Sequence, residues 1–169
     1  AFQRVLPDGT VVGHHPLDLP ERSLVTHAVW WTMPGEELAL AGIAEDEVAG
    51  ALHAAEHASI GMLPLLATCD RWDLGGVSTV SHPDTGLPTV MVYDGHPGGA
   101  GFSRRAFAVA PTWLASTRDL VQGCSCTSGC PACVQSPKCG SGNDPLHRAG
   151  AVAVLEHLLS ERVVAVPTA

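Results

Sequence analysis

Apolar residues recur at intervals of three and four positions over residues 45–67, which is the pattern of a helix with one buried face. The recurring positions are Val48, Leu52, Ala55, Ser59, Met62 and Leu66. Acidic residues at 45–47 favour the first turn of a helix, because its N-terminus carries a partial positive charge. Pro64 lacks an amide hydrogen, so we expect it to kink or end the helix. The pattern predicts a helix over Glu45–Ala67.

A second pattern, rich in β-branched and aromatic residues, predicts strands. It covers Leu24–Met33, which we expect to be a buried strand. Val77–His82 and Leu87–Asp94 flank a Pro-Asp-Thr-Gly turn and predict a hairpin whose second arm is apolar enough to be a central strand. Near the N-terminus, Val5–Val12 surrounds a Pro-Asp-Gly turn and predicts a short strand pair, followed by an extended linker over His14–Glu21.

Three further helices are expected in the second half of the chain. The first follows the Gly-rich segment Gly95–Gly101 and covers Phe102–Val109. Pro111 suits the first turn of the next helix, which extends to about Gln122. The last covers Leu146–Leu159, with Asp144-Pro145 as its cap and first residue.

The order of these elements predicts the fold class. Strands and helices do not alternate strictly, which favours an α+β fold with a small mixed or antiparallel sheet packed with helices. A Cys-, Gly- and Ser-rich segment without periodicity, residues 123–143, lies between the last two helices. We expect residues 1–22 to be a strand pair and linker belonging to a preceding region, and residues 23–169 to form the domain. Because the chain begins with Ala, we expect it to be a piece of a longer protein or a processed one.

Composition narrows the class of protein. The 169 residues are 46% hydrophobic and 15% charged, which suits one compact domain and argues against global disorder. No apolar run approaches the roughly 20 residues that span a bilayer, and no signal-peptide pattern is present. The net charge of −8 argues against a free-standing nucleic-acid binder. The charge is uneven, with net −10 over residues 1–101 and net +3 over residues 102–148. Either the two parts face different partners, or the charged residues are simply scattered along the chain.

Five of the six cysteines lie within 16 residues, which predicts a metal site. They are Cys124, Cys126, Cys130, Cys133 and Cys139; Cys69 is separate. Such short spacings let four thiolates reach one tetrahedral Zn²⁺, and we take Cys124, Cys126, Cys130 and Cys133 as its ligands, with Cys139 as a substitute. One structural zinc per chain would then stabilise a segment too poor in apolar residues to fold alone. Disulfides, a Cys-x-x-Cys redox pair and an iron–sulfur cluster are the alternatives, and each fits the spacing or context less well.

The cysteine segment resembles the zinc-binding C-terminal domain of Mrf-type DNA repair helicases, which are superfamily 2 DNA-dependent ATPases. The resemblance is carried by GCSCTSGCPACVQSPKCGSGNDPL at residues 123–146. Further segments are similar: THAVW at 26–30, HAAEHA at 53–58, DRWDLGG at 70–76 and YDGHPGGAGF at 93–102. The resemblance covers about residues 24–160. It implies a zinc-stabilised accessory domain attached to two RecA-like motor domains.

What the resemblance implies about function is more specific than the residues alone. It implies that the domain braces the motor domains of the same polypeptide and helps guide a DNA strand, with single-stranded DNA and a partner nuclease as partners, in the cytoplasm at the bacterial nucleoid. The chain itself contains no Walker A lysine motif and no DExH box, so we expect no ATPase activity from it. As low-affinity DNA contacts we take Arg104, Arg105, Lys138 and Arg148.

Two other motifs suggest functions different from that of a structural zinc domain. His53, Glu56 and His57 form an H-x-x-E-H pattern in which both histidines lie on one helical face, as in an inverse-order zinc metallopeptidase. A histidine-rich helix gives the same pattern by chance. Gly95–Gly101 stands between a strand and a helix, where backbone amides bind phosphate, although a tight turn explains the glycines equally well. A stand-alone metallopeptidase and a zinc protein-interaction module are therefore the alternative functions.

Trp30, Trp31, Trp72 and Trp113 are aromatic residues that could stack on bases. Because aromatic residues make up only 5% of the chain, we expect them in the core or at an interface between domains.

Overall fold

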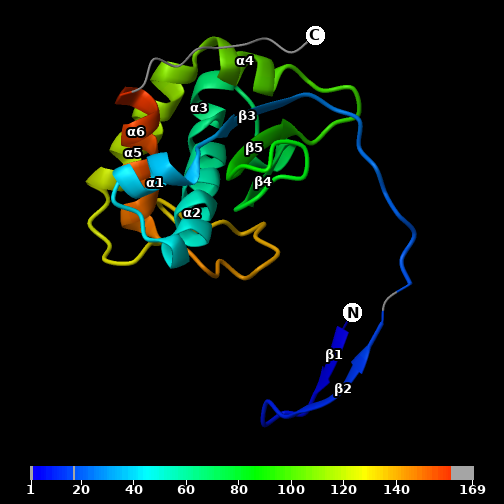
Figure 1. The fold of residues 1–169 in the computed structure, drawn as a ribbon. Coiled ribbons are helices and arrows are strands. Elements are labelled where there is room, and N and C mark those ends of the chain that lie inside the picture. Colours follow the sequence, from blue (N-terminus) through cyan, green and yellow to red (C-terminus); the bar gives the residue numbers. More distant parts are fainter. Residues whose placement is uncertain (1, 17, 161–169) are drawn as a thin grey trace.

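The computed structural model describes residues 2–16 and 18–160, which form two antiparallel sheets and a set of helices (Figure 1). The strands are β1 (Phe2–Val5), β2 (Val11–His15), β3 (Ala28–Thr32), β4 (Leu74–Thr79) and β5 (Thr89–Asp94). The α-helices are α1 (Gly35–Leu40), α2 (Val48–Met62), α3 (Pro64–Ala67), α4 (Phe102–Ala108), α5 (Ala110–Gly123) and α6 (Arg148–Ser160). Two 3-10 turns, η1 (Glu45–Glu47) and η2 (Arg71–Asp73), precede α2 and β4. The α+β class expected from the sequence is confirmed.

The larger sheet has the order β3-β5-β4, and both pairs are antiparallel. β5 is the central strand, as its apolar sequence predicts, and Val90 and Val92 are fully buried within it. β4 and β5 form the predicted hairpin, in which Leu74 pairs with Asp94 and Thr79 with Thr89. β1 and β2 form the predicted strand pair near the N-terminus, and Figure 1 shows this hairpin apart from the helices and the larger sheet.

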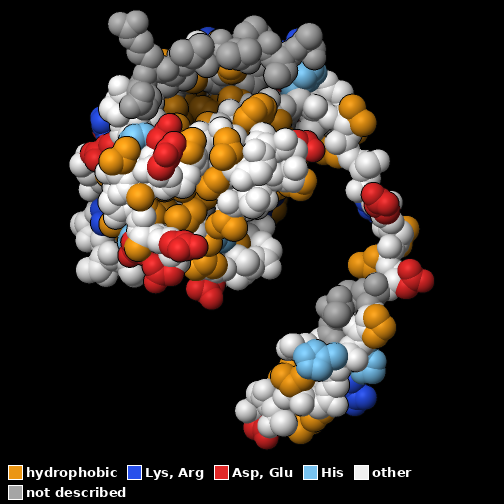
Figure 2. Space-filling view, in the orientation of Figure 1, with side chains coloured by type: hydrophobic (Ala, Val, Ile, Leu, Met, Phe, Trp, Pro, Cys, Tyr) orange, Lys and Arg blue, Asp and Glu red, His pale blue; other side chains and the backbone are white. Residues whose placement is uncertain are grey.

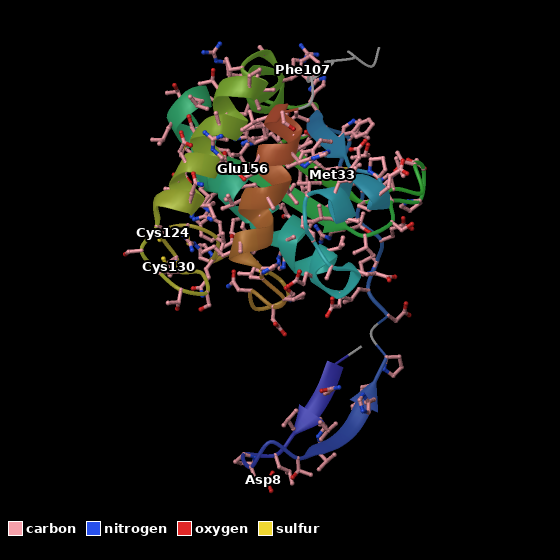
Figure 3. All side chains as sticks on the ribbon, turned by 60° about the vertical axis from the view of Figure 1, so that its left-hand side comes forward. Asp8, Met33, Phe107, Cys124, Cys130 and Glu156 are labelled. Atoms are coloured by element: carbon pink, nitrogen blue, oxygen red, sulfur yellow. The ribbon has the colours of Figure 1, made fainter. Side chains whose placement is uncertain are left out.

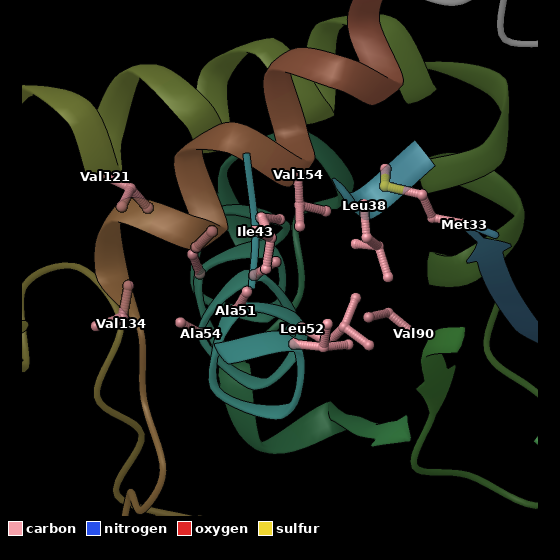
Figure 4. Packing of buried hydrophobic residues seen from close by; sticks show 14 of the residues in the cluster. Met33, Leu38, Ile43, Ala51, Leu52, Ala54, Val90, Val121, Val134 and Val154 are labelled. Carbon is pink, nitrogen blue, oxygen red and sulfur yellow. The ribbon is translucent and has the colours of Figure 1, made fainter. Parts of the chain in front are cut away.

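Helix α2 is the centre of the core and is buried on nearly all sides. Four fully buried alanines, Ala51, Ala54, Ala55 and Ala58, let neighbouring elements approach closely. β4, β5, α5 and α6 all pack against this helix. Figure 4 shows Val121, Val134 and Val154 near Ala51 and Ala54, so α5, the cysteine loop and α6 share one core with α2.

The tryptophans divide between the core and the surface. Trp113 is fully buried, donates from Nε1 to the Ser59 carbonyl at 2.9 Å, and meets Trp31 edge-on with ring centroids 5.9 Å apart. Trp30 and Trp72 are exposed instead. Their hydrophobic surface lies outside the core of this chain.

Several element boundaries differ from the sequence prediction. The helix expected over 45–67 is divided into η1, α2 and α3, because Pro64 begins a separate turn after Leu63. The last helix begins at Arg148 rather than at Pro145, because the preceding residues contact α2: the His147 amide donates to the Gly50 carbonyl at 2.9 Å. α1 was not predicted, and β2 extends to His15, into the expected linker. Residues 161–169 of the expected domain lie outside the described part.

Within the described residues, no helix combines the length and apolar character that crossing a membrane requires.

Candidate metal centre

The loop after α5 brings four thiols together between the ends of α5 and α6. Figure 3 labels two of these residues, Cys124 and Cys130, on the loop. The sulfurs of Cys124, Cys126, Cys130 and Cys133 lie within 4.8 Å of one another. Cys124 Sγ is 3.5 Å from Cys126 Sγ and 3.6 Å from Cys130 Sγ, and Cys133 Sγ is 3.5 Å and 3.8 Å from those of Cys126 and Cys130. Four sulfurs about 2.3 Å from one tetrahedral ion would be about 3.8 Å apart. The four-thiol group therefore fits a zinc ion.

Backbone and core contacts hold this loop in place. The amides of Cys133 and Val134 donate to the Cys130 carbonyl at 3.0 and 3.2 Å, which makes a tight turn between two of the thiols. Val134 is fully buried in the core beside α2 and α5. Gly129 has φ +115 and faces Val134 so closely that a side chain there would collide with it. The loop is therefore anchored by its apolar residue as well as by its thiols.

Arg148, the first residue of α6, closes the other side of the loop. Its guanidinium donates to the carbonyls of Val121 at 2.7 Å, Gln122 at 3.2 Å and Cys124 at 2.7 Å. These are unpaired carbonyls of the last turn of α5 and the first residue of the loop, and a cation is the group that such a helix end favours. Arg148 thus joins α6, α5 and the four-thiol group.

The electrostatics of the thiols favour a bound cation. Hydrogen bonds from the Cys126 backbone and thiol, and from the Cys130 thiol, lower the pKa of Cys124 to about 7. Burial raises the pKa of Cys133 to about 12. Adjacent thiolates repel one another, so all four can ionise together only with a cation among them. A Zn²⁺ ion would supply that charge and leave no position open for a catalytic water.

Cys139, expected as a substitute ligand, lies beside the helix α2 histidines. Its Sγ is 3.3 Å from His53 Nε2, and Cys139, His53 and His57 form a second group of potential ligands. Burial lowers the pKa of His57 to about 4, so this ring is neutral near pH 7. Burial raises the pKa of Glu56, which is 7% exposed. The H-x-x-E-H residues and Cys139 thus share one region of the fold.

The Gly-rich segment carries no free row of backbone donors at the start of α4. The Asp94 carboxylate, fully buried at the end of β5, already accepts hydrogen bonds from the amides of Ala100, Gly101 and Phe102 at 2.7, 2.7 and 3.2 Å. Gly99 has φ +79, and a side chain there would collide with the His27 ring. An internal carboxylate thus occupies the place expected for a phosphate, and the tight-turn explanation of the glycines holds.

The four basic residues expected to contact DNA have different surroundings. Lys138 Nζ donates to the Leu74 carbonyl at 2.7 Å, and Arg148 is engaged as described above. Arg104 and Arg105 are exposed; Arg104 Nη2 lies 2.9 Å from His27 Nε2 and Arg105 Nε donates to the Leu66 carbonyl at 3.3 Å. Neither forms an ion pair with Asp73 or Asp94 in the described part of the chain.

The surface has no strong basic stripe on the face drawn in Figure 2. Acidic side chains are spread over this face, and Lys and Arg side chains show near its edges.

The fold and the four-thiol loop define a small α+β domain built around a candidate zinc centre. The family model described as the MrfA Zn-binding domain matches residues 55–134, which include all four thiols of the loop. The chain belongs to this family of zinc-binding domains, and the resemblance noted from the sequence is confirmed.

Three relatives show the range of the family. The chain is 32% identical over 123 residues to the ATP-dependent helicase YprA of Bacillus subtilis, covering 73% of this chain and 16% of that protein. It is 32% identical over 112 residues to protein MJ1572.1 of Methanocaldococcus jannaschii, covering 64% of this chain and all of that protein. A crystal structure of the DUF1998 helicase MrfA bound to DNA superposes with a TM-score of 0.70 at 26% identity, over 92% of this chain and 20% of that one. The chain thus spans about a sixth of one relative and the whole of another.

Two residues with a clear structural role escape sequence reasoning. Asp94 anchors the Gly-rich segment, and its position at the end of a strand just before the glycines is the signal that could have found it. His27 contacts both Gly99 and Arg104, and nothing in the local sequence indicates this.

Proposed function

We propose that this domain is the zinc-stabilised accessory domain of an ATP-dependent DNA repair helicase, where it braces RecA-like motor domains and helps guide the DNA strand. The observation that carries the proposal is the four-thiol group set between α5 and α6. The similarity to a helicase solved with DNA supports it. Residues 23–169 would form the accessory domain, with residues 1–22 belonging to the preceding region.

The zinc has a structural role in this proposal. Four thiolates fill a tetrahedral shell, so the ion would bind no reacting water. Its contribution is to fix the loop that joins α5 to α6, because binding free energy at such a site is folding free energy. The domain alone would hydrolyse neither ATP nor peptides, and ATP hydrolysis would belong to the motor domains.

DNA contact by the domain would be weak. Lys138 is exposed, but its ammonium group donates to the Leu74 carbonyl, and the Arg148 guanidinium donates to backbone carbonyls around the loop. Arg104 and Arg105 are exposed and each has one protein partner, so they are the stronger candidates for a DNA contact. Residues 102–148 carry net +3, and four thiolates on one Zn²⁺ reduce this to about +1. Affinity for nucleic acid depends on neutralised phosphates, so tight binding needs the motor domains. We also propose a partner nuclease and a place at the bacterial nucleoid, as the resemblance to DNA repair helicases implies.

The test is unwinding by the full-length helicase that contains this domain. Arg104→Ala/Arg105→Ala should reduce unwinding more than it reduces the thermal stability of the protein, while Arg118→Ala, which removes a half-buried arginine paired with Asp119, should leave unwinding unchanged. A double variant that unwinds normally but melts several degrees lower would show that the two arginines only hold the fold.

A further inference from the structure

A second group of metal-binding side chains lies outside the four-thiol loop. His53 and His57 lie one turn apart on α2, with ring centroids 4.2 Å apart. Cys139 reaches them from the loop before α6, and the ligand atoms of all three residues lie within 4.8 Å of one another. The 3.3 Å between Cys139 Sγ and His53 Nε2 is close to the roughly 3.5 Å expected between a sulfur and a nitrogen bound to one tetrahedral Zn²⁺.

Backbone carbonyls fix the tautomer of both imidazole rings. His53 Nδ1 lies 2.8 Å from the Pro145 carbonyl oxygen, and His57 Nδ1 lies 2.8 Å from that of Val134. Because a carbonyl oxygen only accepts, each Nδ1 carries the hydrogen, and Nε2 of a neutral ring keeps its lone pair. Metal-binding histidines in proteins are held in this way, with the second nitrogen donating to a carbonyl or carboxylate.

The third group, Cys139, has surroundings that suit a thiolate. The Asn143 amide donates to its sulfur at 3.2 Å, and the Ser141 hydroxyl lies 3.2 Å away. The thiolate is the form of cysteine that binds metal, and hydrogen bonds to sulfur stabilise it. Cys139 is therefore suited to bind a metal ion together with the two histidines, rather than to replace a thiol of the four-thiol group.

We propose that His53, His57 and Cys139 form a second, mononuclear Zn²⁺ site. Two imidazoles and one thiolate are donors that Zn²⁺ favours over Mg²⁺ or Ca²⁺. All three residues line a cavity of about 640 Å³, which Glu56 and Ser141 also line, so the fourth position is open to water or a small ligand. The donor set is not that of a peptidase with a carboxylate third ligand. His53 and Cys139 also lie outside the segment 55–134 that the family model matches.

Such an ion would tie the segment before α6 to α2. The segment already contacts this helix through the His147 amide and the Gly50 carbonyl and through Pro145 and His53. A metal bond to Cys139 would add a third link at the same place. The proposed metal site does not depend on whether the domain contacts DNA.

The test counts zinc in the whole chain after reconstitution with Zn²⁺ and removal of excess metal. Wild type should hold about two ions, and Cys139→Ser and His53→Gln should each hold about one, with unchanged far-ultraviolet circular dichroism. Cys69→Ser and His82→Gln, a cysteine and a histidine outside both groups, should keep two. With Co²⁺, the difference between the wild-type and Cys139→Ser spectra should show a single thiolate-to-metal band, weaker than that of the four-thiol site.

Several outcomes would overturn the proposal. One zinc in wild type that persists in Cys139→Ser would show that the cluster is a hydrogen-bonded Cys–His pair without metal. Two zincs that both persist in Cys139→Ser and His53→Gln would place the second ion elsewhere. If Cys139→Ser fails to fold, His53→Gln decides alone, because His53 is only half-buried.

Discussion

Asp94 accepts two hydrogen bonds from Ser103: its Oδ1 lies 2.5 Å from the serine hydroxyl oxygen and 2.8 Å from the serine backbone nitrogen. Asp94 ends β5, and Ser103 belongs to the first turn of α4. The carboxylate therefore stabilises the helix N-terminus and holds the Gly-rich segment against the sheet. No bound anion is required to stabilise this helix N-terminus.

Removing this charge should destabilise the domain. In Asp94→Asn one oxygen becomes an amide that donates, so buried backbone donors lose their acceptor. We expect the free energy of unfolding to fall by about 3 kcal/mol, measured by chemical denaturation of the zinc-loaded chain. Asp84→Asn in the exposed β4–β5 turn is the control and should change stability by less than about 0.5 kcal/mol. Equal stability of the two variants would contradict this role of Asp94.

The same carboxylate predicts a pH dependence. Burial alone would raise the pKa of Asp94, but hydrogen bonds from Ser103 and from the Ala100 and Gly101 amides lower it below its ordinary value. A group whose pKa is lower in the folded state stabilises fully above its unfolded pKa of about 3.9, and this contribution is lost as the pH falls through the folded pKa. The stability difference between wild type and Asp94→Asn should therefore be constant from pH 7 to 5 and shrink below pH 4. Unfolding titrations of both proteins in parallel cancel effects of zinc release. A difference that stays constant down to pH 2 would show that Asp94 does not titrate in this way.

Sequence patterns predicted those elements whose signal is local. The apolar positions of α2 recur along one segment, and the β4–β5 hairpin has its turn sequence between its strands, so both were found. α1 has only six residues, too few to show a period, and it forms because Leu38 is buried in the core. The sequence predicts too early a start for α6, because the His147–Gly50 contact that holds the preceding residues on α2 joins positions far apart in the chain.

The candidate sites divide in the same way. The four thiols of the loop lie within ten residues, so their spacing alone predicts that they meet. Cys139 lies 86 positions from His53, and only the packing of the loop before α6 on α2 brings them together. The partners of Lys138 and Arg148 are backbone carbonyls of distant elements, which composition and charge cannot indicate.

Loss of one thiol of the loop should unfold the C-terminal part of the domain. Cys130→Ser should lose the zinc of the four-thiol site, because three thiolates and a hydroxyl bind Zn²⁺ much more weakly. We expect α6 and the loop to lose protection in hydrogen exchange, with zinc release followed by a thiol-reactive titrant. Cys69→Ser, a cysteine outside both groups, should keep that zinc and its protection. A folded, soluble Cys130→Ser chain with native exchange and no metal would contradict a structural role for the ion.

Arg148 should prove to be a structural residue that lysine cannot replace. Its planar guanidinium reaches carbonyls of three residues at once, whereas a lysine amine presents its donors at one point. Arg148→Lys should lower the free energy of unfolding by about 1 kcal/mol and Arg148→Met by about 2 kcal/mol, since the carbonyls then lose charged donors. Thermal denaturation of the zinc-loaded chain measures both, with Arg118→Lys and Arg118→Met as controls at an arginine that, within the described residues, pairs only with its neighbour Asp119. If Arg148→Met were as stable as Arg118→Met, the contacts with α5 would contribute nothing.

The isolated domain should bind single-stranded DNA weakly, through Arg104 and Arg105. Both arginines are exposed near the start of α4, and their protein partners are an imidazole and a carbonyl rather than carboxylates, so little charge competition opposes a phosphate. Each phosphate contact on a single strand changes the slope of log K against log salt concentration by about 0.7, so the slope should be about −1.4 for wild type and near zero for Arg104→Gln/Arg105→Gln. Fluorescence anisotropy with a labelled oligonucleotide at several salt concentrations measures it, with Arg118→Gln as the matched control. Because the domain is acidic overall, affinity should be in the weak, non-specific range even at low salt. Equal slopes for wild type and the double variant would show that the arginines contact no phosphate and that any DNA binding arises elsewhere in the chain.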